Sequence, residues 1–101
     1  MSFRVVSVAN TIIDQFGGTR RLSLMVNAKN FTRGPDSFSF KFSGSREFTH
    51  IRVVLTAADT YTVTFMKFTG TKLGATKEFT DIYADMLVTL FEDTTKLYLS
   101  L

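Results

Sequence analysis

The chain lacks cysteine and tryptophan altogether, and it has one histidine and one proline among 101 residues. The absence of cysteine excludes disulfides, thiolate metal sites and thiol nucleophiles. One histidine and scattered carboxylates do not provide a three- or four-ligand zinc site. No apolar run approaches the ~20 residues that a membrane-spanning helix requires. We therefore expect no membrane segment, no metal and no cofactor.

Phenylalanine supplies the large apolar side chains in place of tryptophan. Eleven residues are phenylalanine, and hydrophobic residues make up 45% of the chain. That much apolar surface excludes a disordered chain. The length fits a single domain over residues 1–101.

Strict alternation of apolar and polar residues is the clearest pattern in the sequence. From Ser37 to Ser43 every second residue is phenylalanine, and serine or lysine stands between. A period of two is typical of a strand with one buried and one solvated face. The same pattern predicts strands over 20–28, 50–57 and 60–69, with a bulge near Met66, and a weaker strand over 73–80.

Helical spacing occurs near both ends of the chain. Apolar residues recur at three- and four-residue steps over 4–16 and 81–94, which predicts two helices. Gly17-Gly18 should end the first helix, and Thr80 or Asp81 should cap the second. We expect a loop over 29–36, where Gly-Pro-Asp favours a turn, and either an edge strand or docked leucines over 96–101.

These elements predict an α+β fold. Short connections make the sheet antiparallel, with four to five strands. An N-terminal and a C-terminal helix must pack on one face of the sheet to bury its apolar side. The expected order is α-β-β-β-β-(β)-α, and the second face of the sheet is left open.

Signals of catalysis are weak. The only histidine, His50, begins a predicted strand without an evident partner, and a lone histidine is more often a surface residue than a general acid or base. Asp81 and Asp85 suit the start of a helix better than a cation site. We expect a protein that is not an enzyme and has no catalytic residues.

The open sheet face is the candidate binding surface. Residues 1–52 hold eight Lys or Arg against three Asp or Glu, a net charge of +5 on one half of the chain. Positive charge favours a polyanion, hydroxyl and guanidinium groups bind phosphates, and an exposed ring can stack on a base. The candidate residues on the face are Arg21, Lys41, Arg52, Thr64 and Phe68, and those in the loop at its margin are Lys29, Phe31 and Arg33.

Three interpretations of this face stay open. The first is a surface that binds nucleic acid. The second is a protein-interaction module, such as an inhibitor of a host protein or an assembly subunit, that uses edge strands with Met66 and Phe68. The third is simply the solvated side of an antiparallel sheet, with Phe31 filling the core under its loop. Homo-oligomerisation is compatible with each.

Four stretches of the sequence resemble a known group. MVNAKNF (25–31), LTAADTYTVTF (55–65), YADML (83–87) and LYLSL (97–101) resemble small proteins of unknown activity that phages, prophages and related mobile elements encode. Glycine often stands in that group at the position of Lys96, which bears on where the last helix ends. The resemblance transfers no site residues. It implies a viral or mobile-element protein that acts in the cytoplasm of a bacterial host.

Overall fold

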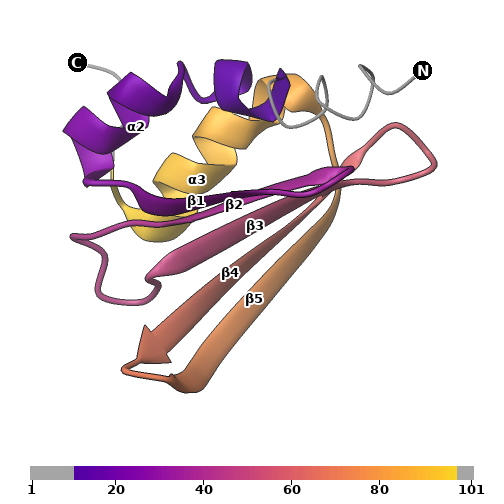
Figure 1. Ribbon diagram of the computed structural model, residues 1–101. Helices are drawn as coiled ribbons and strands as arrows, with labels where there is room; N and C mark the ends of the chain where they lie inside the picture. Colours follow the sequence, from indigo (N-terminus) through magenta and orange to yellow (C-terminus); the bar gives the residue numbers. More distant parts are fainter. Residues whose placement is uncertain (1–10, 98–101) are drawn as a thin grey trace.

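The computed structural model of the protein describes residues 11–97, in which a five-stranded antiparallel sheet carries helices on one side (Figure 1). The strands lie in chain order, and each pairs with the next. Their bounds are β1 Lys29–Arg33, β2 Ser37–Lys41, β3 His50–Leu55, β4 Tyr61–Thr69 and β5 Lys72–Ile82. The helical elements are a segment over 11–15, α2 Thr19–Val26, the 3₁₀ turn η1 Ala84–Met86 and α3 Leu87–Thr95. The predicted α+β class is confirmed, and no helix in the described range is long and apolar enough to cross a membrane.

The first predicted helix, over 4–16, is confirmed where the structure describes it. Residues 11–15 are helical, and residues 1–10 lie outside the described part of the chain. Gly17 and Gly18 both have φ 93°, a left-handed conformation that glycine adopts without a steric penalty. The Gly18 N–H donates to the Ile13 carbonyl over 2.9 Å, which satisfies a carbonyl at the helix end.

The strand predicted over 20–28 is wrong, because most of these residues form α2. Two periods fit the sequence here: Leu22, Leu24 and Val26 alternate, but Leu22 and Val26 are also four residues apart, on one side of a helix. Burial shows which period applies. Leu22 and Val26 are 0% and 2% exposed, whereas Leu24 is 75% exposed. Asn27 ends the helix with φ 54°, and its backbone N–H donates to the Leu22 carbonyl.

The loop predicted over 29–36 is wrong for its first part, which forms the edge strand β1. Lys29 and Thr32 are three residues apart, while their partners in β2 are two apart, so β1 holds one extra residue. Asn30 lies in this bulge with φ 56°. The bulge breaks the alternation by which a strand is recognised. The order is therefore helix, helix, five strands, helix, in place of the predicted α-β-β-β-β-(β)-α.

β5 confirms the weakest predicted strand, over 73–80, and extends it at both ends. The bulge expected near Met66 is present: from Met66 to Phe68 there are two steps in β4 and three in β5. A second register shift lies near the other end of the pair, and there too the extra residue is in β5. The tail over 98–101 lies outside the described residues.

The last helix begins later than the predicted range of 81–94. Asp81 takes φ 57° within β5, and Ile82 is buried at the end of that strand, so the residues expected to cap a helix belong to the sheet. α3 starts at Leu87, directly after η1. It ends at Lys96, whose φ of 63° is the left-handed conformation in which glycine is most easily accommodated.

Phenylalanine rings fill the space between the sheet and the helices. Phe38, Phe40 and Phe42 alternate along β2 and just beyond it, and each is at most 1% exposed. The strand predicted from these three residues is confirmed. Phe91 of α3 meets them from above, with its ring centroid 5.1 Å from that of Phe42 and 6.0 Å from that of Phe16. The helical layer is thereby attached to one face of the sheet.

Leu22→Ala is predicted to lower the free energy of unfolding by about 2–5 kcal/mol, because it leaves a cavity beneath α2. Leu24→Ala is the matched control on the exposed side of the same helix, and we expect a change of at most about 0.5 kcal/mol. Urea denaturation of both variants measures these values. Equal losses would contradict the helix, since a strand would place both leucines in the core.

Candidate functional site

The second face of the sheet has no described helix over it (Figure 1). Residues paired across antiparallel strands lie on the same side of the sheet, so the register identifies the side chains of this face. Phe40 and Ile51 belong to the core side, and their sequence neighbours belong to the other. We call that other side the open face. Two rows cross it from β1 to β5: Lys29, Lys41, His50, Met66, Thr76; and Thr32, Ser39, Arg52, Thr64, Glu78.

Basic side chains gather on the part of the open face formed by β1, β2 and β3. Lys29 and Lys41 lie opposite each other, and Arg52 follows in the next row. All of them are exposed, and none makes an ion pair with a residue in the described range 11–97. Like charges directly opposite each other are destabilising, so fold stability does not explain this arrangement. Glu78, the acid that the register adds to the face, is two strands away from Arg52.

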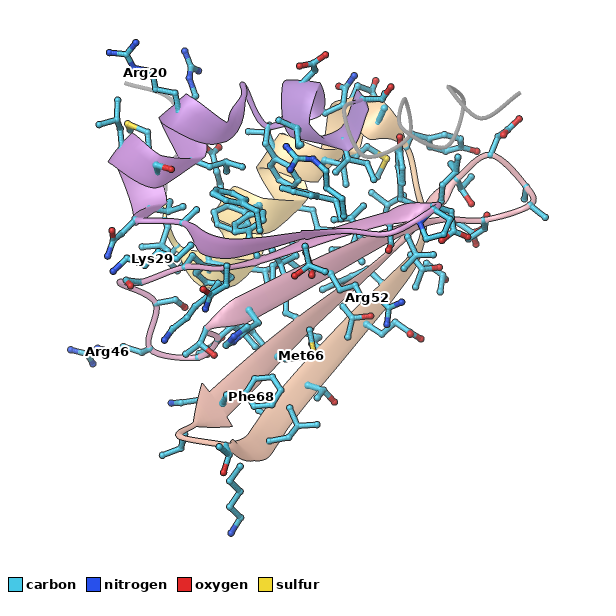
Figure 2. The ribbon with its side chains drawn as sticks, viewed as in Figure 1. Arg20, Lys29, Arg46, Arg52, Met66 and Phe68 are labelled. Carbon is cyan, nitrogen blue, oxygen red and sulfur yellow. The ribbon has the colours of Figure 1, made fainter. Side chains whose placement is uncertain are left out.

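An aromatic and apolar patch lies on the same face at β3, β4 and β5. The rings of His50 and Phe68 meet at 68°, with their centroids 4.7 Å apart. Met66 is paired with His50, and Leu73, which is 50% exposed, is paired with Phe68. Figure 2 shows Arg52, Met66 and Phe68 on the side of the sheet away from the helices. We call His50, Met66, Phe68 and Leu73 the aromatic patch.

The Thr49 side chain bonds the imidazole of His50 and the backbone of Phe68 through one hydroxyl oxygen. Its hydroxyl oxygen accepts a hydrogen bond from the Phe68 backbone N–H over 2.9 Å. The same oxygen lies 2.7 Å from His50 Nδ1. The Thr49 hydroxyl also donates to the Met66 carbonyl over 3.5 Å, and the tautomer of the imidazole sets whether Nδ1 or Oγ1 is the donor in the shorter contact. One side chain thus ties the start of β3 to the part of β4 that lies opposite the bulge in β5.

The imidazole of His50 is favoured in its neutral form. Desolvation by burial lowers its pKa below the ordinary value of 6.5, and the positive charge of Lys41 lowers it further. The positive charge of the open face is consequently confined to Lys29, Lys41 and Arg52, and the aromatic patch is uncharged at neutral pH.

The structure places five predicted site residues on the open face, where they form one continuous surface. Thr64 is paired directly with Arg52 and lies between it and Glu78. Lys29, expected at the margin of the face, lies in its first row because β1 is a strand. The set on the open face is Lys29, Lys41, Arg52, Thr64 and Phe68.

The other predicted site residues lie in or beside the helical layer. Arg21 is in α2, because the segment 20–28 is not a strand. Phe31 stacks on Phe38, with ring centroids 5.8 Å apart and planes at 12°, so it packs against the core as the third interpretation expected. Arg33 is paired with Phe38 and shares its side of the sheet. None of these side chains contributes to the open face.

Sequence reasoning missed two members of the site. Alternation puts His50 and Met66 on the open face, but it carries no signal for the position of Thr49, which precedes β3. Thr49 is recognised as part of the site only from its hydrogen bonds to β4. Met66, the nearest of its partners there, is 17 positions away in the chain. Leu73 was missed because the extra residue in β5 shifts its alternation.

Other surface features do not involve the open face. A hollow of about 290 Å³ is lined by Ile82, Asp85, Met86, Thr89, Leu90 and Asp93. A second, of about 320 Å³, is lined by Gly44, Arg46, Glu47, Thr94, Thr95 and Lys96. Within the described part of the chain, no group of three His, Asp or Glu side chains is placed to hold a metal ion.

Comparison with known proteins gives no match: no family model, no curated protein and no solved structure is significantly similar to this chain. Inferences about its function therefore rest on the residues of the open face.

His50 is predicted to make the protein less stable as the pH falls below 6.5. Its pKa is lower in the folded than in the unfolded chain, so between the two values the unfolded chain binds more protons. The free energy of unfolding should rise with pH through that interval and then level off. Denaturation at a series of pH values measures the step, and His50→Gln should remove it. Because the chain has one histidine, its NMR titration is unambiguous, and a pKa of 6.5 or higher would contradict the prediction.

Proposed function

We propose that the protein is a non-enzymatic accessory protein of a phage or mobile element that binds nucleic acid through the open face in the cytoplasm of a bacterial host. The observation that carries the proposal is the pair Lys29 and Lys41, which lie opposite each other with Arg52 in the next row. These cations are exposed, and none has an ion-pair partner among the described residues.

Phosphate groups are the natural complement of such a surface. Two opposed lysines repel each other in the free protein, and a bound anion relieves that repulsion. Cations that neutralise phosphates also release condensed counterions, which supplies the affinity of sequence-independent binding. A partner with regularly spaced negative charges therefore gains more from this face than a single small anion does.

Hydroxyl groups extend the basic surface. Thr32 and Ser39 are paired in the same row as Arg52, and Thr64 follows on the other side of it. Serine and threonine hydroxyls bind phosphate and sugar oxygens, and such contacts fix a nucleic acid in place without reading its sequence. We therefore expect binding with little sequence preference.

Affinity for an oligonucleotide is predicted to fall steeply with salt concentration, and Arg52→Gln should weaken it. Removing one phosphate contact should reduce the slope of log K against log salt by about one unit. The matched control is Arg20→Gln, which removes an exposed arginine from α2, on the other side of the sheet (Figure 2). Fluorescence anisotropy of a labelled oligonucleotide measures both variants.

Equal effects of the two substitutions would show that overall charge, and not the open face, causes the binding. Absence of binding at ~50 mM salt, where the counterion effect is strong, would count against the proposal as a whole.

A protein partner is the second candidate. The observation that favours it is Leu73, a large apolar side chain that is 50% exposed beside Phe68. Exposed apolar groups on a sheet are a frequent element of protein interfaces. Nuclease treatment distinguishes the two candidates, because it releases a partner held through nucleic acid and leaves a protein complex intact.

A further inference from the structure

We infer that the open face takes a single strand of nucleic acid in preference to a duplex, with its phosphates over the basic rows and a base stacked on Phe68. This inference rests on the proposed function and adds the class of nucleic acid. It draws on the aromatic patch, which a contact to phosphates alone does not require.

Phe68 meets the conditions for a stacking platform. Phe68 lies in β4, and its side chain is half-buried, so part of the ring is accessible. The ring is held by the perpendicular contact with His50 at 4.7 Å, and its backbone N–H is bonded to Thr49. A ring that is already ordered loses little conformational entropy when a base stacks on it.

The distance between the cations and the ring suits a short single strand. Neighbouring strands lie about 4.8 Å apart, and Phe68 is two residues, or about 6.7 Å, further along β4 than Met66, which shares a row with Lys41 and Lys29. The backbone of Phe68 is therefore roughly 12 Å from that of Lys41 in β2 and about 16 Å from that of Lys29 in β1. A single-stranded nucleic acid laid across the sheet therefore meets positive charge first and an uncharged ring next. Its backbone and one of its bases are bound by different parts of one rigid surface.

A duplex lacks the second of these contacts. Its base faces are stacked inside the helix, and proteins reach the base edges by inserting a helix or a β-ribbon into a groove. Phe68 lies on the face of a sheet, and no described helix covers or flanks it there. A duplex would consequently engage only the cations, whereas a single strand also gains stacking energy.

The lack of tryptophan in the chain provides a direct test. Phe68→Trp introduces the only indole, and its fluorescence should be quenched when oligo(dT) binds, because stacking places a base against the ring. Polyphosphate and heparin are the controls, because they neutralise the same cations without offering a base. We expect quenching with oligo(dT) and none with the two controls.

A pair of substitutions at the same position measures the energy of stacking. Phe68→Leu keeps an apolar side chain but removes the ring, and it should weaken oligo(dT) binding by about 5- to 150-fold while leaving duplex binding unchanged. Phe68→Tyr keeps the ring and should bind oligo(dT) like the parent protein. The tyrosine variant also shows that a change at this position does not itself prevent folding.

The outcomes separate the inference from the proposed function. Equal affinity for oligo(dT) and duplex, with no quenching and no effect of Phe68→Leu, would overturn the inference while leaving nucleic-acid binding intact. Binding that Phe68→Leu weakens equally for both forms would also overturn it. Failure to bind either form would overturn the proposed function, and the inference with it.

Discussion

The ring of Phe91 is the contact on which the two layers of the structure depend. It comes from α3 and meets the rings of Phe16, Phe40, Phe42 and Phe65, with centroid distances from 5.1 Å to 6.4 Å. Phe16 directly follows the first helical segment, Phe40 lies in β2 with Phe42 just beyond it, and Phe65 lies in β4. A single side chain therefore joins both ends of the described chain to the sheet. Aromatic pairs of this kind add stability beyond the area they bury. The helical layer is therefore committed to one face, and no described helix covers the other.

The separation of a packed face from an open face explains how the sheet tolerates two lysines opposite each other, a pairing that stability alone would disfavour. The opposition of Lys29 and Lys41 costs free energy, but the core on the far side of the same strands supplies enough to offset a cost of this size. Residues that conflict with stability on an otherwise consistent fold are often functional. Thr49 acts in the same sense, because it orders His50 and Phe68 on a surface where packing would not.

The elements that sequence predicted well are those with one possible period. From Ser37 to Ser43 only a strand buries every phenylalanine, and alternation then places Arg52 on the open face without further information. The segment around Leu24 satisfies both a strand and a helix, and the choice depends on the core beneath it, which no local pattern contains. Asn30 breaks the alternation of β1 through an extra residue, so that strand has no signal. The contacts of Thr49 arise from distant residues and need the fold itself.

Both outer strands carry the extra residues, while the pairing of β2 with β3 and of β3 with β4 is regular. A bulge twists the free edge of a sheet, and the left-handed backbones of Asn30 in β1 and Asp81 in β5 mark where this happens. Charged side chains, such as Lys72 and Lys77, also line β5. The edges of this sheet are thus poor templates for adding a strand from another molecule. The described edges therefore disfavour the edge-to-edge pairing by which a chain so rich in phenylalanine would grow into β-fibres.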